Sequence, residues 1–205
     1  MFSAILLTSL AMFAPAHATP KALTFASMLS GRFSDIDLSP LENYEVEQYQ
    51  QGFMIMLQPV LVPNLQPLMT FYGREWVNGS LMRHYLTTVK EGGDGLIHMD
   101  VYDFPGRHTI RNFTEDLVQN LTAPRQCHTI FQQVEETVFV GIWPFCTGVS
   151  GEVPEQFIII LTCNSFIACP PNSGMLHVNK LIERINLLPY MTSGVDGNST
   201  QPCRA

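Results

Sequence analysis

Short extended segments separated by turn residues constrain the fold of this chain more than any other feature. The segments are rich in β-branched and aromatic residues, and each ends near proline, glycine or asparagine. They cover 53–62, 68–77, 81–89, 96–104, 128–133, 137–145 and 156–163. Asn78-Gly79, which lies between two of them, is the strongest short signal for a β-hairpin. This spacing predicts an antiparallel sandwich or barrel, and we favour the barrel because closure leaves no exposed strand edges.

Helical periodicity is confined to three short segments. Apolar residues recur at helical spacing from Leu23 to Leu29, which predicts a short N-terminal helix ended by Gly31. The segment 113–121 is also predicted to be helical, with two acidic residues in its first turn. Near the C-terminus, the apolar residues of 178–188 fall on one helical face and stop before Pro189. We therefore expect a C-terminal amphipathic helix that packs on the barrel.

The composition indicates one folded domain. Hydrophobic residues make up 46% of the 205 residues and charged ones 14%, which excludes a disordered chain. The net charge of -7 argues against nucleic-acid binding, since that requires clustered Lys and Arg. No segment after residue 18 is long enough to predict a membrane span. We expect a single domain over 19–192, a polar segment over 34–51 that runs on its surface, and a polar tail over 193–205.

The N-terminal segment has the pattern of a secretory signal peptide. Residues 2–15 form an uncharged apolar run, and Ala16-His17-Ala18 provides small residues for cleavage after Ala18. A buried N-terminal helix is the alternative interpretation. Four Asn-x-Ser/Thr sequons support export, because such sites are glycosylated in secreted proteins. They predict glycosylation at Asn78, Asn112, Asn120 and Asn198.

All five cysteines lie in the second half of the chain. No two of them form a Cys-x-x-Cys pair or a zinc-binding pattern, so disulfides in an oxidising compartment are the better interpretation. The predicted disulfide-forming residues are Cys127, Cys146, Cys163 and Cys169. Because five is an odd number, one thiol is left over. We expect it to be Cys203, in the C-terminal tail, either free or paired between chains.

Motifs for catalysis are missing from the sequence. There is no Gly-x-Ser-x-Gly, His-Glu-x-x-His, phosphate-binding loop or dinucleotide-binding pattern, so no catalytic residue is assigned and no cofactor is required. His98 and Asp100 form the one tight pair of potential metal ligands, and no third ligand lies nearby in sequence. We therefore expect no metal site.

The strands within 68–104 carry the candidate binding residues. Aromatic and ionisable side chains alternate there with aliphatic ones, which predicts one polar and one apolar face. The polar face either meets solvent or lines the lumen. A polar lumen suits a large conjugated ligand with carboxylates, because aromatic rings stack, Arg pairs with carboxylates and Asp accepts N–H bonds. The candidate ligand-binding residues are Tyr72, Arg74, Glu75, Arg83, Tyr85, His98, Asp100 and Tyr102.

The same region carries a family resemblance. Its motifs are Leu-Ser-Gly-Arg-Phe-Ser at 29–34, Phe-Tyr-Gly-Arg-Glu at 71–75 and Leu-Met-Arg-His-Tyr at 81–85, followed by 95–104 and 121–127. Phe139-x-Gly141-x-Trp143 lies further along. In order and spacing, these motifs resemble the CpcT/CpeT family, the T-type bilin lyases that attach open-chain tetrapyrroles to cysteines of phycobiliproteins. The resemblance covers roughly residues 23–169.

Several expectations follow from the resemblance. It implies a lipocalin-like barrel, often dimeric, that binds a bilin and transfers it to a cysteine of an acceptor protein. Glu75 and Arg83 would hold the polar groups of the bilin, and Tyr72, Tyr85 and Tyr102 would line the cavity. Cys127 and Cys146 occupy the positions of two family cysteines and are expected to pair with each other.

Three functions are compatible with the sequence. The first is a bilin lyase or a direct derivative of one. The second is a secreted lipocalin-type protein that binds a tetrapyrrole or another apolar ligand without catalysis. The third is a structural or matrix glycoprotein whose barrel is filled by its own side chains.

Overall fold

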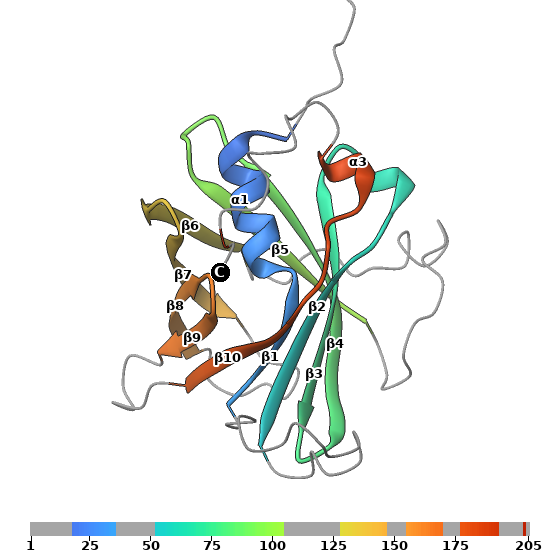
Figure 1. Cartoon of the computed structure of the whole chain (residues 1–205), viewed down its shortest axis with the longest axis vertical. Helices are drawn as coiled ribbons and strands as arrows, with labels where there is room; N and C mark the ends of the chain where they lie inside the picture. The colour runs from blue at the N-terminus through green and yellow to red at the C-terminus, as the bar shows by residue number, and fades with distance from the viewer. Residues whose placement is uncertain are drawn as a thin grey trace, which may run out of the picture.

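The described part of the chain folds into one closed barrel of antiparallel strands (Figure 1). The structure is a computed structural model, and it describes residues 18–35, 52–104, 128–146, 155–169, 177–192 and 203. The strands are β1 (Gly31–Ser34), β2 (Phe53–Pro59), β3 (Met69–Val77), β4 (Ser80–Glu91), β5 (Ile97–Asp103), β6 (His128–Glu135), β7 (Val138–Cys146), β8 (Glu155–Thr162), β9 (Ser165–Cys169) and β10 (His177–Arg184). From β2 to β10 consecutive strands are neighbours, and β1 closes the barrel between β10 and β2. The predicted barrel is therefore confirmed.

The β3–β4 hairpin forms as the Asn-Gly signal predicts. Asn78 and Gly79 have φ angles of 49° and 76°, as a two-residue hairpin turn requires. The side-chain oxygen of Asn78 accepts a hydrogen bond from the backbone N–H of Gly52 at 3.0 Å, which joins the turn to the start of β2. Asn78 is exposed, whereas the other three sequons lie outside the described residues.

One helix occupies the upper end of the barrel, which we define as the top in Figure 1. Helix α1 (Pro20–Leu29) begins at Thr19, whose hydroxyl accepts from the Ala22 N–H, and it has Pro20 in its first turn. Its buried side chains are Ala22, Leu23, Phe25, Ala26, Met28 and Leu29. The ring of Phe25 packs on Phe131 of β6 and Phe139 of β7, with centroids 4.7 and 5.1 Å away. Helix α1 therefore closes this end of the lumen with apolar contacts.

Gly31 does not end the helix, which corrects the sequence expectation. The helix ends at Leu29, Ser30 is its C-cap in an extended conformation, and Gly31 is already the first residue of β1. A Cβ at Gly31 would lie 2.8 Å from both Leu181 Cδ1 and the carbonyl oxygen of Glu183. The glycine is needed there because β10 approaches closely, and not for a helix cap.

The predicted C-terminal helix over 178–188 is wrong. Residues His177–Arg184 form strand β10, which pairs with β9 and β1. A short helix, α3 (Pro189–Thr192), follows after four residues. The apolar residues fit both a helical and an extended pattern, and barrel closure decides between them. A strand here gives the edge groups of β1 and β9 their hydrogen-bond partners.

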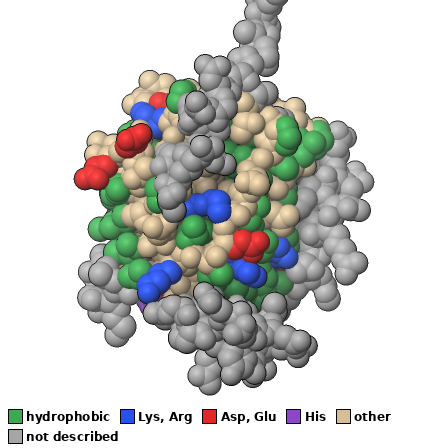
Figure 2. All heavy atoms as spheres, in the orientation of Figure 1, with side chains coloured by type: hydrophobic (Ala, Val, Ile, Leu, Met, Phe, Trp, Pro, Cys, Tyr) green, Lys and Arg blue, Asp and Glu red, His purple; other side chains and the backbone are tan. Residues whose placement is uncertain are grey.

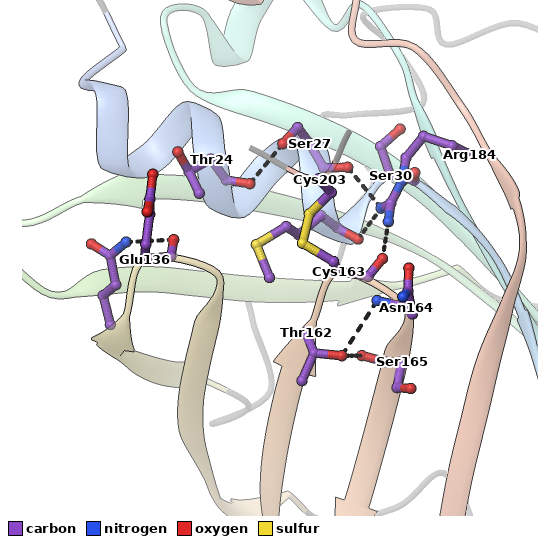
Figure 3. The surroundings of a disulfide bond; sticks show 12 residues. Thr24, Ser27, Ser30, Glu136, Thr162, Cys163, Asn164, Ser165, Arg184 and Cys203 are labelled. Atoms are coloured by element: carbon purple, nitrogen blue, oxygen red, sulfur yellow. Dashed lines mark hydrogen bonds between the residues drawn. A yellow bond between two sulfur atoms is a disulfide. The ribbon is translucent and has the colours of Figure 1, made fainter. Parts of the chain in front are cut away.

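The disulfide pattern also differs from the prediction. Cys163 is bonded to Cys203, so Cys203 is not the unpaired cysteine, and Cys169 is a free thiol (Figure 3). The chain terminus is thereby attached to the β8–β9 turn, where Cys203 packs against the core. Cys127 lies outside the described residues, as do residues 1–17, 36–51 and 113–121, and the side chain of Cys146 is not described.

Arg184 joins the same region from within the barrel. Its guanidinium donates to the carbonyl oxygens of Ser27 and Met28 at 2.9 and 2.5 Å, and also to that of Cys163 (Figure 3). These carbonyls belong to the last turn of α1 and to the β8–β9 turn. Burial lowers the pKa of Arg184. A cation at the helix C-terminus complements the helix dipole and satisfies carbonyls that have no partner within the helix.

The outer surface differs around the barrel. Over β3 and β4 it is covered by a second apolar cluster of Val62, Tyr72, Leu86 and Phe104. Over β6–β8 it bears a row of exposed isoleucines, Ile130, Ile142 and Ile158, which are cross-strand partners. Figure 2 shows hydrophobic side chains on the visible face, with Lys, Arg, Asp and Glu side chains scattered among them. Among the described residues no helix has the length and apolar character needed to cross a bilayer.

Candidate ligand-binding site

The strand register divides the eight predicted ligand-binding residues between the two faces of the barrel wall. Glu75 pairs with Arg83, and Gly73 pairs with Tyr85, on the inner face. Tyr72 and Arg74 alternate with these residues and lie on the outer face. So do His98, Asp100 and Tyr102, whose cross-strand partners are Lys90, Thr88 and Leu86. Alternation along β3 already separates Glu75 from Tyr72 and Arg74, and the register agrees with it. The expectation that Arg83 and Tyr85 share a face with Tyr72 and Arg74 is wrong. The register of the hairpin places Arg83 opposite Glu75. Which residues of two strands face each other cannot be read from the pattern of either strand alone.

The inner group is organised around Gly73. The ring of Tyr85 lies over this glycine, and a Cβ at Gly73 would come within 2.2 Å of the ring. The guanidinium carbon of Arg83 lies over the same Tyr85 ring, 5.0 Å from its centre. Tyr85 is buried, while Glu75 and Arg83 are half-buried. The missing side chain of Gly73 leaves room for the Tyr85 ring to lie against the barrel wall, and the Arg83 guanidinium lies over this ring.

Two polar side chains that the sequence reasoning missed also face the lumen. Thr129 follows the outward-facing His128 on β6, and Asn179 lies between the exposed Val178 and Lys180 on β10. Both are almost fully buried, and neither Thr129 Oγ1 nor Asn179 Oδ1 has a hydrogen-bond partner. The amide nitrogen of Asn179 does donate to the Phe166 carbonyl at 3.2 Å. A buried polar atom without a partner is costly, so an internal water or a ligand is the usual explanation. Their alternation with outward residues was the one signal available in the sequence.

Helix α1 is attached to the upper end of the barrel. Lys21 forms an ion pair with Glu91 at 3.2 Å and donates to the Gly95 carbonyl at 2.7 Å, which ties the helix to the β4–β5 turn. The opposite end is the end of the β3–β4 hairpin, where Glu75 and Arg83 lie (Figure 1).

Tyr72 and Arg74 belong to an outer cluster with a structural role. The Tyr72 hydroxyl is 3.1 Å from His84 Nδ1, and the His84 ring stacks on Phe104 with centroids 5.4 Å apart. The Arg74 guanidinium lies 5.3 Å from the Tyr72 ring and 5.4 Å from that of Trp76. It also donates to Gln58 Oε1 at 3.2 Å. These contacts join side chains of β2, β3 and β4 to Phe104 on the outer face of the barrel wall.

His98 and Asp100 belong to a second outer group, a chain of four side chains on β5, β6 and the turn before β5. Asp94 contacts His98 Nε2 at 3.1 Å, and His98 Nδ1 is 2.8 Å from His128 Nε2. His128 Nδ1 is 2.5 Å from Asp100 Oδ1. The backbone N–H of Leu96 and the His98 side chain lower the pKa of Asp94. Burial and the charge of Asp100 raise the pKa of Tyr102.

Fold and site together define a closed antiparallel β-barrel, plugged by a helix at one end and carrying polar groups in the other half of its lumen. Comparison with protein-family models, with curated proteins and with solved structures found no match to this chain.

Proposed function

We propose that this protein binds a small organic ligand with carboxylate groups in the lower half of its lumen, and that the ligand is an open-chain tetrapyrrole. The observation that supports the proposal most directly is the pair of buried, unpartnered oxygens of Thr129 and Asn179 on the inner face. Stability alone gives no reason to keep such groups in a core, whereas a bound ligand would supply their hydrogen bonds. The choice of a tetrapyrrole comes from the sequence resemblance.

The inner group has the chemistry that a bilin needs. A bilin has carboxylates, pyrrole N–H donors and a conjugated system. Arg83 would pair with a carboxylate, and Glu75, its cross-strand partner, would accept N–H bonds. The Tyr85 ring provides a flat surface for stacking beside Gly73. The ligand would replace contacts that these side chains now make within the protein.

Chromophore transfer is the second step of the proposal. After binding, the protein would shield the reactive vinylic carbon from water and present it to a cysteine thiol of an acceptor protein. Only the resemblance supports this step. Binding without transfer would make the protein a lipocalin-type carrier.

The binding test uses the full chain and a visible titration with biliverdin or phycocyanobilin. We expect saturable binding and a shift of the bilin absorption band. Arg83→Gln is expected to weaken binding at least tenfold, because it removes a charged partner of the carboxylate. Arg74→Gln is the matched control, since Arg74 lies on the outer face of the neighbouring strand, and it should leave the affinity unchanged.

The outcomes separate the three functions. No shift with the native protein would exclude bilin binding and favour a structural barrel filled by its own side chains. An equal loss for Arg83→Gln and Arg74→Gln would contradict the assignment to the inner face. Adding an acceptor peptide with one cysteine then distinguishes a lyase, which forms a thioether adduct, from a carrier, which does not.

Secretion is part of the proposal, and the Cys163–Cys203 bond is compatible with it. Expression in a eukaryotic secretory system should yield protein in the medium that begins at Thr19. Treatment with an N-glycosidase should reduce its mass. Retention in the cell with residues 1–18 intact would favour the buried-helix interpretation of the N-terminus.

A further inference from the structure

We propose that His98 and His128 form a binding site for a borderline divalent transition-metal ion, Cu²⁺ in preference to Zn²⁺, on the outer face of β5 and β6. The two imidazoles face each other, with His98 Nδ1 2.8 Å from His128 Nε2. They come from strands that pair antiparallel, with Asp100 opposite His128. The site is separate from the inner group, because it lies on the opposite side of the barrel wall.

The second nitrogen of each ring is already occupied by a carboxylate. His98 Nε2 is 3.1 Å from both oxygens of Asp94, and His128 Nδ1 is 2.5 Å from Asp100 Oδ1. A carboxylate accepts only from N–H, so these contacts assign a proton to each outer nitrogen. The same arrangement of carboxylate, histidine and metal orients the imidazole ligands of known metal sites and makes them more basic. The two nitrogens that face each other share a hydrogen bond, and a metal ion would take the place of the proton between them.

The distance between these nitrogens favours a tetragonal ion. Two nitrogens about 2.0 Å from a metal at a right angle are about 2.8 Å apart, whereas tetrahedral ligands are about 3.3 Å apart. Without a metal, 2.8 Å is the length of an N–H···N hydrogen bond between the rings. A right-angled arrangement, which Cu²⁺ adopts with nitrogen and oxygen ligands, would keep the two nitrogens at nearly this separation. Cu²⁺ also binds imidazole more tightly than Zn²⁺ does, and Mg²⁺ and Ca²⁺ prefer oxygen. A small rotation of the more exposed ring, His128, would turn its lone pair towards the ion.

The surroundings suit an exposed cation site. The His98 and His128 side chains are 17% and 39% exposed, so an ion can reach them from solvent. Asp94 and Asp100 provide two negative charges beside the imidazoles. One positive charge lies on a cross-strand partner, Lys90, opposite His98. Within the described residues no group of three or more His, Cys, Asp and Glu side chains is placed to hold a metal. Water would therefore complete the coordination of the ion, and the preference for one metal over another would come from the two imidazole ligands.

The test is a titration of the full chain with Cu²⁺. Calorimetry measures the affinity and the stoichiometry, and electron paramagnetic resonance reports the ligands of the ion. All proteins carry Cys169→Ser, because a free thiol reacts with Cu²⁺. We expect one bound ion per chain, a tetragonal spectrum with coupling to two nitrogens, and weaker binding of Zn²⁺. Mg²⁺ should not compete.

Variants locate the site. His98→Asn and His128→Asn are each expected to weaken Cu²⁺ binding by at least tenfold and to remove one nitrogen coupling. Asp94→Asn should weaken it by about 10–100-fold while both nitrogens remain coupled. His177→Asn, a change of an exposed histidine on β10, is the control and should have no effect. The circular dichroism of each variant checks its fold, and His98→Gln and His128→Gln serve as second variants.

Two results would overturn the proposal. One is the absence of 1:1 Cu²⁺ binding by the native fold. The other is binding that keeps its affinity and both nitrogen couplings in His98→Asn and His128→Asn, which would place the ion elsewhere. Neither result bears on the bilin titration, since that depends on the inner face.

Discussion

The two ends of the lumen are built in opposite ways. At the upper end, α1 packs its aromatic and aliphatic face onto β6 and β7, and Arg184 and the Cys163–Cys203 bond hold the adjoining turns. In the rest of the lumen, Thr129 and Asn179 keep buried oxygens without partners, and Arg83 and Glu75 face each other at the hairpin end. The upper end has the features of a stabilising core. The lower half has polar groups that cost stability, which is where a binding function is to be sought.

The largest effect is expected from a cavity at the upper end. Phe25→Ala should lower the free energy of unfolding by about 3–5 kcal/mol, because Phe25 is fully buried against two other rings. Urea denaturation measures the change. Phe53→Ala, at the lower end, is the control and should cost clearly less, because Phe53 is only half-buried. Similar losses at both sites would mean that the two ends are packed alike.

The disulfide is expected to have the next largest effect. Replacing Cys163 and Cys203 together by Ser should lower stability by about 4 kcal/mol, on a chain-entropy estimate for a separation of 40 residues. The change is measured by thermal unfolding under non-reducing conditions. Cys169→Ser removes a cysteine without breaking a bond and should leave the unfolding temperature nearly unchanged. Peptide mapping that finds Cys163 bonded to Cys169 would contradict the assignment.

Arg184 is expected to contribute less than the disulfide. Arg184→Met keeps most of the side-chain volume but leaves the carbonyls of Ser27, Met28 and Cys163 without their donor. We expect a loss of about 2–3 kcal/mol, typical of hydrogen bonds to a charged group. The control is Arg32→Met, which removes an ion pair between the half-buried Arg32 and the exposed Glu183 and should cost less than about 1 kcal/mol. Equal losses would show that Arg184 acts as an ordinary surface charge.

The smallest expected effect is a change in the free energy of unfolding that has opposite signs at two buried threonines. It tests whether the lower half of the lumen contains an unpartnered polar group. Thr87 and Thr129 are both buried, but Thr87 donates to the Asp100 carbonyl at 2.8 Å and Thr129 has no partner. Thr87→Val should destabilise the protein by about 1 kcal/mol, and Thr129→Val should stabilise it by about 1 kcal/mol. Chemical denaturation without ligand measures both. A loss at Thr129 as large as at Thr87 would indicate a bound water there.

Most of the fold could be predicted from the sequence because β-branched runs and turn residues are local signals. All seven predicted strands are present, with ends within three residues of the expected ones. β1 and β9 have only four and five residues, and such short strands do not show a period. β10 was mistaken for a helix because its apolar residues fit either period, and barrel closure made the choice.

The candidate site was harder to predict, because it depends on how strands are aligned. Alternation separates Glu75 from Arg74, but the sequence could not show that Arg83 shares the face of Glu75 and not that of Arg74 and His98. His128 lies 30 residues from His98, and only the pairing of β5 with β6 brings the two rings together. For Thr129 and Asn179 the sequence offered only their alternation with outward residues, since an unpartnered atom is a property of the packed core.

By itself, the sequence determined that this chain is an antiparallel sandwich or barrel, with the barrel favoured, and that it has an apolar N-terminal helix and an excess of acidic charge. It did so because alternation, turn chemistry and composition act on neighbouring residues. The tertiary structure alone decided which side chains face the lumen, which cysteines pair, and that residues 177–184 form a strand. Those outcomes depend on register and closure, in which one residue of offset moves a side chain to the opposite face of the wall.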